Sequence, residues 1–227
     1  MRRHMLRQIN RQAMIASINP RSPVSETFRM LRTNLQFLIN DDGLKVISVI
    51  SANPGEGKST TLVNLAITFA DEGKRVLLID GDLRRSSLHQ IFQLRNEMGL
   101  SNYLGRKSDI QNIIHQTYIH NLDVITSGPV TYNPSELLGS AKFIQLIEQL
   151  KEQYDLVLFD SPPLIVADSK IIASKADGVI IVVKSGKTRR DDVLKLKNQL
   201  EGVNVNVLGV VLNNHKPQKM NGYHHYY

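Results

Sequence analysis

The sequence contains no cysteine. Neither a disulfide framework nor a thiolate metal site is therefore available, and the chain is compatible with a reducing compartment. Long apolar runs are also missing, because stretches such as residues 178–183 are far shorter than the roughly 20 residues that a transmembrane helix needs. The arginine-rich start lacks the apolar stretch of a secretory signal. We therefore expect a soluble protein.

Net positive charge is concentrated at the start of the chain, and the rest of the chain is nearly balanced in charge. The formal net charge is +7. Residues 1–32 hold seven arginines and one acid, Glu26, so this stretch carries +6 and the rest of the chain only +1. A basic face over the whole protein is not supported, and no nucleic-acid partner is expected. Residues 1–20 are predicted to be a basic, flexible arm, which either meets an anionic membrane or an acidic partner or is a solvated tail.

Apolar runs alternate with helical patterns along the rest of the sequence, which is long enough for one α/β domain at residues 21–215. Six runs predict strands at residues 46–51, 76–80, 122–126, 156–160, 179–184 and 207–213. Helices are predicted between them, for example at residues 58–71, 134–153 and 189–200. This alternation indicates a mostly parallel central sheet with helices on both faces. Ligands bind beyond the carboxyl ends of such strands, so polar residues directly after each run are candidate site residues.

A phosphate-loop pattern follows the first predicted strand. Residues 52–59 read Ala-Asn-Pro-Gly-Glu-Gly-Lys-Ser and match G-x-x-x-x-G-K-[ST], with alanine in place of the first glycine. Two glycines let backbone N–H groups close around phosphate oxygens, and the following helix offers its positive N-terminus. Lys58 is expected to reach the β- and γ-phosphates of ATP, and the Ser59 hydroxyl to bind Mg²⁺. The predicted nucleotide-binding residues are Pro54, Gly55, Glu56, Gly57, Lys58, Ser59 and Thr60.

Three aspartates end predicted strands beside this loop. Asp80 and Asp82 follow the second run, in Leu-Leu-Ile-Asp-Gly-Asp-Leu-Arg, and could hold magnesium, accept a proton from an attacking hydroxyl, or do one task each. Asp160 ends the fourth run after four apolar residues, which is the form of a Walker B aspartate. Each acid alone is typical of an ordinary strand end. Together beside a phosphate loop, they indicate a phosphoryl-transfer site.

These motifs resemble the deviant-Walker P-loop NTPases, the group with a MinD-like fold. Within that group, Ser-x-x-Pro-Gly-Glu-Gly-Lys-Ser, Leu-Ile-Asp-Gly-Asp-Leu-Arg, Phe-Asp-Ser-Pro-Pro and the tyrosine-rich end resemble the bacterial protein-tyrosine kinases of capsule and exopolysaccharide clusters. The resemblance extends from about Pro20 to the C-terminus. Asn53 stands where relatives that segregate chromosomes or place division sites usually carry a signature lysine. The absence of that lysine favours the kinase branch.

The resemblance implies a role for each matching residue. Lys58, Asp80 and Asp82 are the expected catalytic residues, and Ser59, Asp80, Asp82 and Asp160 are the expected magnesium ligands. Which of Asp80 and Asp82 acts as the base is left open. Asn213, in Gly-Val-Val-Leu-Asn-Asn, resembles the residue that reads adenine, although a turn-forming asparagine is an equally simple interpretation.

Glu26, Arg29 and Arg32 resemble the E-x-x-R-x-x-R oligomerisation motif of these kinases, which assemble into rings. Helical spacing keeps their charges off the apolar stripe of a helix that begins near Ser25, on a flank that could face another subunit. A solvated charged face is the alternative. With the resemblance, an interface is favoured.

The last residues, 216–227, are predicted to be a flexible tail whose tyrosines, Tyr223, Tyr226 and Tyr227, are autophosphorylated by a neighbouring copy in the ring. The added charge of phosphorylation is expected to favour disassembly. Metal binding by His224 and His225, and packing of the three rings as an apolar anchor, are the alternatives.

Relatives of this type act at the inner face of the membrane. The resemblance therefore implies a cytoplasmic protein recruited there by a membrane-embedded activator, with protein-tyrosine substrates and a cognate tyrosine phosphatase as further partners. The alternatives are a nucleotide-dependent assembly switch and a MinD- or ParA-like positioning ATPase without kinase activity.

Overall fold

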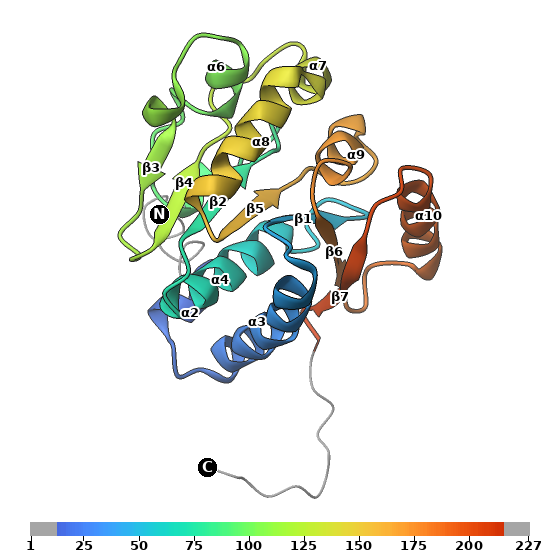
Figure 1. Cartoon of the computed structure of the whole chain (residues 1–227). Coiled ribbons are helices and arrows are strands. Elements are labelled where there is room, and N and C mark those ends of the chain that lie inside the picture. Colours follow the sequence, from blue (N-terminus) through green and yellow to red (C-terminus); the bar gives the residue numbers. More distant parts are fainter. Residues whose placement is uncertain (1–12, 216–227) are drawn as a thin grey trace, which may run out of the picture.

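A seven-stranded sheet forms the centre of the protein, for which a computed structural model describes residues 13–215 (Figure 1). The strand order is β3-β4-β2-β5-β1-β6-β7, and every neighbouring pair is parallel except β3 and β4. The strands are β1 (Val46–Ser51), β2 (Val76–Asp80), β3 (Ile114–Gln116), β4 (Leu122–Ile125), β5 (Leu156–Asp160), β6 (Gly178–Lys184) and β7 (Val207–Asn213). The predicted, mostly parallel sheet is confirmed.

Helices cover both faces of this sheet. One face packs on α2 (Ile15–Ile18), α3 (Pro23–Asp42), α4 (Lys58–Asp71) and α5 (Leu88–Ile91). The other face packs on α6 (Leu100–Leu104), α7 (Pro134–Gly139), α8 (Ala141–Gln153), α9 (Ala167–Ala173) and α10 (Arg190–Glu201), with a 3₁₀ turn, η1 (Ile110–Asn112), nearby. Successive residues of a strand point to opposite faces, so Ile47 and Val49 join the first core and Val46 joins the second. All described helices are too short or too polar to cross a membrane.

The start of the domain lies earlier than predicted. Met14 and Ala16 are buried against α4, and the Ala16 N–H donates to Asn64 Oδ1 at 2.8 Å. Asn64 Nδ2 in turn donates to the carbonyl of Ala13 at 2.9 Å. The prediction of a flexible arm up to residue 20 is therefore wrong for residues 13–20, because the apolar stretch Ala-Met-Ile-Ala joins the core. Residues 1–12, which contain Arg2, Arg3, Arg7 and Arg11, lie outside the described residues.

The long helix α3 carries the proposed oligomerisation residues. It begins after Ser22, whose side chain accepts a hydrogen bond from the Ser25 N–H, and it ends at Gly43 in the left-handed region. Arg29 pairs with Glu26 at 2.6 Å, and both remain partly exposed. Arg32 does not face outward: its side chain is 12% exposed and pairs with Glu72 of the same chain at 2.5 Å. An oligomerisation role for Glu26, Arg29 and Arg32 stays a prediction. For Arg32 this role would require breaking the ion pair with Glu72.

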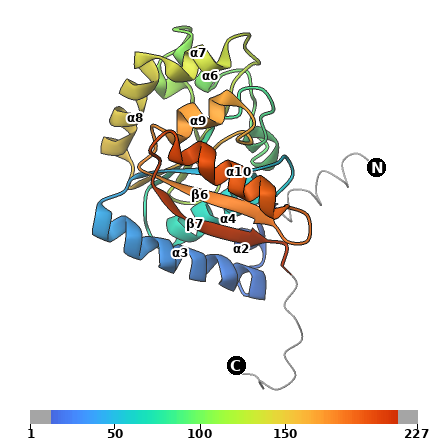
Figure 2. The same cartoon turned by 90° about the vertical axis from the view of Figure 1, so that its right-hand side faces the viewer.

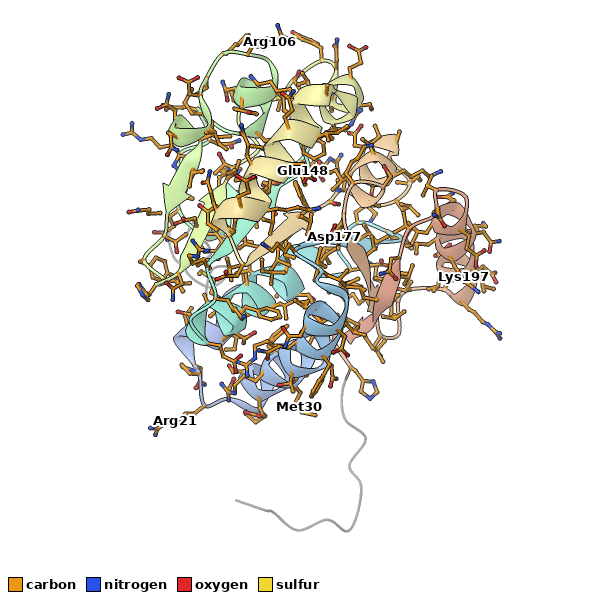
Figure 3. All side chains as sticks on the ribbon, in the orientation of Figure 1. Arg21, Met30, Arg106, Glu148, Asp177 and Lys197 are labelled. Carbon is orange, nitrogen blue, oxygen red and sulfur yellow. The ribbon has the colours of Figure 1, made fainter. Side chains whose placement is uncertain are left out.

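Apolar side chains remain uncovered on α3 and on the edge strand β7. Met30 points to solvent from α3 (Figure 3), and Val210 and Leu212 are exposed on β7. β7 runs along the end of the sheet with α10 above it and α3 below it (Figure 2). Its last residue is Asn213, so this edge strand delivers a predicted nucleotide-binding residue to the carboxyl ends of the strands.

Candidate active site

The phosphate loop connects β1 directly to α4, which is the context that the motif requires. Gly55 and Gly57 have φ angles of 75° and 96°, a region that side chains with a Cβ rarely adopt. At Gly57 the space is also filled, because a Cβ atom there would lie 1.9 Å from Asn213 Nδ2. Asn213 Nδ2 donates to the carbonyl of Glu56 at 2.9 Å. The structure thus brings Asn213 onto the loop, in a hollow that Lys184 and Thr60 also line.

Glu56 anchors the loop to the rest of the domain. Its side chain is buried and accepts hydrogen bonds from the Asn53 N–H at 3.1 Å and from the Thr188 hydroxyl at 2.6 Å. Thr188 lies just before α10, so the loop is tied to the segment that follows β6. The Glu56 side chain therefore points into the protein, and only its backbone is free to take part in the predicted nucleotide contacts.

The Asn53 side chain is held within its own chain. Its Nδ2 donates to Asp192 Oδ2 at 3.2 Å and to Glu56 Oε1 at 3.4 Å. The position that carries the signature lysine in partitioning ATPases is thus occupied by a side chain that faces α10.

Lys58, Ser59, Asp82 and Asp160 line one pocket at the carboxyl ends of the strands. The Lys58 ammonium donates to Ser51 Oγ at 3.1 Å. Burial lowers the pKa of Lys58 below its usual range, and the nearby Asp160 and Asp82 carboxylates oppose that shift. The partly desolvated ammonium of Lys58 is suited to bind the phosphate oxygens of a nucleotide.

The three aspartates differ in what their oxygens contact. Asp80 is fully buried, and both of its oxygens accept backbone N–H groups: Oδ1 from Asp82 at 3.3 Å, and Oδ2 from Ser87 and Leu88 at 2.9 and 3.0 Å. Burial and the neighbouring Asp160 raise the pKa of Asp80 well above its usual range. Asp80 therefore shapes the loop after β2, and each of its oxygens already accepts at least one backbone hydrogen bond.

Asp82 and Asp160 retain free acceptor atoms. Asp82 Oδ1 accepts the backbone N–H groups of Arg84 and Arg85 at 3.2 and 2.8 Å, while Oδ2 accepts no hydrogen bond among residues 13–215. Asp160 Oδ2 accepts from the Ser87 hydroxyl at 3.1 Å, and Oδ1 is buried without a partner in the described part of the chain. Burial raises the pKa of Asp160, opposed by the Ser59 hydroxyl and Lys58.

These atoms fit a magnesium ion that shares its coordination with a nucleotide. The described residues contain no cluster of three or more His, Cys, Asp or Glu side chains that could hold a metal by themselves. Mg²⁺ at phosphate-transfer sites usually takes one or two protein ligands and fills the remaining positions with phosphate oxygens and water. The buried, unpartnered Asp160 Oδ1 and the Ser59 hydroxyl, which lies 3.0 Å from Ser87 Oγ, supply such a partial set.

Several site residues were not expected from the sequence. Ser87 links Ser59 to Asp160 through its hydroxyl. Arg84 lines the same pocket, and its Nε donates to Asp168 Oδ2 at 2.7 Å. Asp168 is buried at the start of α9 and also accepts the hydroxyl of Ser135 from α7. Arg84 stands within the quoted Asp-Gly-Asp-Leu-Arg motif, which was a usable signal, whereas nothing near Asp168 in the sequence indicates its partner.

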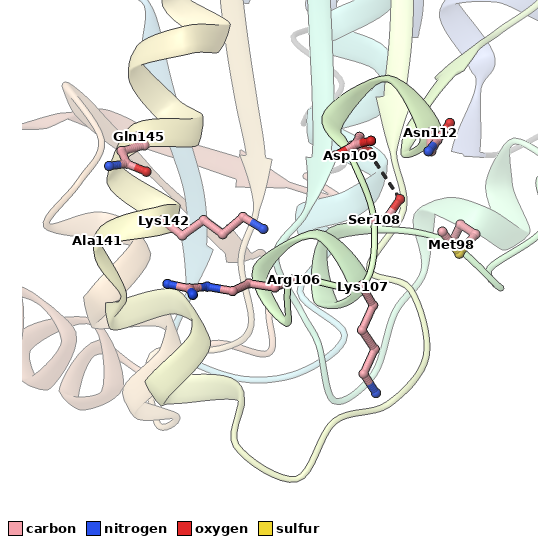
Figure 4. Close-up of a pocket in the computed structure, with 9 residues that line it drawn as sticks. All are labelled: Met98, Arg106, Lys107, Ser108, Asp109, Asn112, Ala141, Lys142 and Gln145. Atoms are coloured by element: carbon pink, nitrogen blue, oxygen red, sulfur yellow. Dashed lines mark hydrogen bonds between the residues drawn. The ribbon is translucent and has the colours of Figure 1, made fainter.

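A second hollow lies away from the phosphate loop, between α6 and α8 (Figure 4). Arg106 and Lys142 extend into it from opposite sides, and the Lys142 ammonium sits 4.2 Å from the centre of the Tyr103 ring. Lys142 also donates to the carbonyl of Tyr103 at 2.5 Å. The hollow includes none of the predicted site residues.

The fold and the pocket define the class first. A phosphate loop between a buried strand and a helix, with aspartates at the carboxyl ends of neighbouring strands, makes this a P-loop nucleotide-binding domain. The sequence profile of a family described as an AAA domain matches residues 44–209.

Comparison with known proteins identifies the family within this class. The tyrosine-protein kinase YwqD of Bacillus subtilis is 42% identical over 214 residues, which cover 94% of this chain and 90% of the relative. The kinase domain of the Escherichia coli tyrosine kinase ETK has a TM-score of 0.87 at 34% identity and covers 94% of this chain and 84% of its own. The chimerical protein CapA2B2 also has a TM-score of 0.87, at 40% identity, with 90% and 91% covered. The chain belongs to the bacterial tyrosine-protein kinases.

The cell division ATPase MinD of Pyrococcus furiosus shares the fold less closely. It has a TM-score of 0.65 at 25% identity and covers 74% of this chain and 71% of its own. The intramolecular hydrogen bonds of Asn53 agree with this separation from the positioning ATPases.

Proposed function

We propose that this chain transfers the γ-phosphoryl group of ATP to tyrosine hydroxyls, including Tyr223, Tyr226 and Tyr227 of a neighbouring copy. The observation that carries the proposal is the contrast between two aspartates after β2. Asp80 is buried and both of its oxygens accept backbone N–H groups, whereas Asp82 lines the pocket with Lys58 and its Oδ2 accepts no hydrogen bond from residues 13–215. A tyrosine hydroxyl has a pKa near 10, so it needs a carboxylate placed to accept its proton.

Each residue of the pocket has a separate task in this proposal. Lys58 and the backbone of the phosphate loop bind the β- and γ-phosphates, and Asn213 borders the adenine site. Asp82 accepts the tyrosine proton, and Asp80 holds the loop that presents Asp82. Ser59 and Asp160 would hold Mg²⁺, which supplies charge neutralisation for the transferred phosphoryl group.

The two aspartates can be distinguished by substitution. Asp82→Asn is expected to lower kcat about 10²- to 10⁴-fold with little change in ATP affinity, because general-base catalysis contributes that range. Asp80→Asn is expected to reduce thermal stability as well, since an amide NH₂ group would face backbone donors. Asp109, an exposed aspartate outside the pocket, provides the matched control in Asp109→Asn.

The assay is phosphotyrosine mapping of purified full-length chain incubated with ATP and Mg²⁺. Label on the tail in the wild type and in Asp109→Asn, but greatly reduced label in Asp82→Asn, is the expected result. Full activity of Asp82→Asn would refute the assignment of Asp82 as the general base. An absence of phosphotyrosine from the wild type would refute the kinase proposal and favour a nucleotide-dependent assembly switch.

The proposal extends to the cellular setting that the relatives suggest. We propose a homo-oligomeric ring in which Glu26, Arg29 and Arg32 contribute to the interface, recruitment to the inner face of the membrane by a membrane-embedded activator, and reversal by a tyrosine phosphatase. The process controlled would be the synthesis or export of a capsule or exopolysaccharide. Membrane fractionation with and without a coexpressed activator tests recruitment, and equal membrane association in both would refute it.

A further inference from the structure

Residues 129–133, between β4 and α7, form an exposed stretch that is fixed at both ends. Before it, Gly128 N–H donates to Asn96 Oδ1 at 2.9 Å. At its far end, the carbonyl of Asn133 accepts the first hydrogen bond of α7, from Leu137 N–H at 3.2 Å. Between these points Val130 is 79% exposed and Tyr132 is fully exposed. The stretch therefore presents side chains to solvent from a fixed position.

The backbone of this stretch is free to pair with another molecule. Within residues 13–215, the N–H groups of Val130, Thr131 and Tyr132 donate no hydrogen bond. Free backbone N–H groups can donate to a protein cleft, in the way that main-chain hydrogen bonds supply affinity for bound peptides. The stretch begins with a proline at position 129 and is followed by another at position 134, which disfavours its conversion into a helix or a central strand.

The stretch lies beside the phosphate pocket of its own chain. Ser135, three residues after Tyr132, donates to Asp168, and Asp168 accepts from Arg84, which lines that pocket. Helix α7 packs on α9, and the loop before α9 forms another wall, with Ile165 exposed on it. Tyr132 itself is not among the residues that line the pocket, and its side chain is fully exposed.

This placement favours transfer between two copies. In an encounter that brings the rim of one copy, with Tyr132, against the pocket face of a second copy, the two sites lie on contacting surfaces. Tyr132 on the rim of one chain would then approach Lys58 and Asp82 of the second. A tyrosine on the opposite end of the sheet could not do so in that encounter.

The other described tyrosines are less available as acceptors. Tyr103 is buried, and the Tyr154 hydroxyl donates to Asp123 at 2.8 Å, with burial and this contact raising its pKa. Tyr118 is 71% exposed, but its hydroxyl lies 3.1 Å from Met14 Sδ. Tyr118 also sits in the turn before β4, at the amino-terminal end of that strand and away from the phosphate pocket.

We propose that Tyr132 is a further phosphorylation site of this protein, modified by a second copy of the chain; this rests on the proposed kinase function. The phenolic oxygen of Tyr132 forms a bond to the γ-phosphorus of ATP, and the bond from that phosphorus to the β–γ bridging oxygen breaks. ADP leaves with the bridging oxygen. The phenolic proton passes to Asp82 of the second copy and then to water.

The test uses a full-length tail variant in which Tyr223→Phe, Tyr226→Phe and Tyr227→Phe are combined. Incubation with ATP and Mg²⁺, followed by phosphosite mapping, is expected to find phosphotyrosine at Tyr132. Adding Tyr132→Phe should reduce total phosphotyrosine at least tenfold. Adding Tyr118→Phe, the matched exposed tyrosine, should leave it unchanged. In a second experiment, the tail variant is mixed with isotope-labelled Lys58→Met protein, which keeps Tyr132 but lacks the phosphate-binding lysine. Phosphotyrosine is expected at Tyr132 of this inactive, isotope-labelled copy.

The outcomes separate the two proposals. Label on the wild-type tail with none on Tyr132 in either background would overturn this inference and leave the kinase function standing. Label on Tyr132 of active copies alone in the mixing experiment would overturn transfer between copies. No phosphotyrosine on any residue would overturn the kinase function and this inference together.

Discussion

Arg84 and Asp168 form an ion pair whose two halves differ in their access to water, and that difference predicts an asymmetry. The Arg84 side chain is 49% exposed and the Asp168 side chain 1%. Removing the arginine leaves a buried carboxylate with Ser135 as its remaining side-chain partner among the described residues. Removing the negative charge leaves an arginine that water can still solvate. The first change should therefore cost more folding free energy than the second.

The expected magnitudes follow from these environments. Breaking a buried ion pair costs about 3–5 kcal/mol, and the Ser135 hydroxyl and the N-terminus of α9 reduce this, so Arg84→Met should cost about 2–4 kcal/mol. Asp168→Asn keeps the shape and one acceptor, so it should cost about 1 kcal/mol. The double variant should cost less than the sum of the two by about 1–2 kcal/mol, since the two residues share one interaction.

Urea unfolding of nucleotide-free protein measures these costs, with far-UV circular dichroism as the signal because the chain has no tryptophan. With a slope of about 2 kcal/mol per molar urea, Arg84→Met should lower the midpoint by roughly 1–2 M. The adjacent Arg85 has no carboxylate partner among residues 13–215, and Arg85→Met should shift stability by less than about 0.5 kcal/mol. Equal costs for the two single variants, or additive costs in the double variant, would refute the reasoning.

Three further predictions concern other parts of the domain. Gly57→Ala should weaken ATP binding at least about tenfold in titration calorimetry, because the alanine Cβ would displace Asn213 and the backbone φ of 96° disfavours alanine. Unchanged affinity would contradict the close contact between position 57 and Asn213. Asn64→Ala should cost about 2–4 kcal/mol in urea unfolding and expose the segment before α3 to proteases, since two buried hydrogen bonds and one partly buried hydrogen bond are lost; protection equal to wild type would argue against the anchoring of this segment by Asn64. Burial alone would raise the pKa of Asp177, but hydrogen bonds from backbone N–H groups and Lys151 bring it below its usual value of about 3.9. Its stabilisation is present above that usual value and is lost as the pH falls through the lower folded value, so the stability gap between wild type and Asp177→Asn should narrow from pH 7 to pH 3; a constant gap would contradict the shift.

Four strands, β1, β2, β5 and β7, have the predicted bounds, because continuous apolar runs leave little choice of where a strand begins and ends. Three of them, β1, β2 and β5, are buried along their whole length, whereas β7 is an exposed edge strand. The short strand β3 was missed: it has three residues, none of them buried, and its pairing with β4 is antiparallel. The predicted helix at residues 134–153 is interrupted at Ser140, whose side chain caps α8 by accepting the Phe143 N–H. A serine inside an apolar helical pattern does not distinguish a cap from an exposed helix residue.

The candidate site could be located from the sequence because its residues directly follow strands. What could not be predicted is how the oxygens of each carboxylate are used. The hydrogen bonding of Asp80 depends on the path of the backbone through Ser87 and Leu88, which brings two N–H groups back to one oxygen. The Arg84–Asp168 pair joins residues 84 positions apart, and neither has a neighbour in the sequence that signals the other. Such contacts are set by the packing of α9 on α7.

The position of Asn213 at the end of β7 fixes a length scale for the tail. Tyr223 and Tyr227 follow it by ten and fourteen residues. A chain spans at most about 3.3–3.6 Å per residue, so whatever path the tail takes, these tyrosines stay within about 35 and 50 Å of the nucleotide site of their own chain. A group confined to such a volume has an effective concentration in the millimolar range. In the proposed transfer between copies, a neighbouring site competes for the tail when assembly holds it inside the same radius, so the rate of the proposed tail phosphorylation would measure how closely the copies are packed.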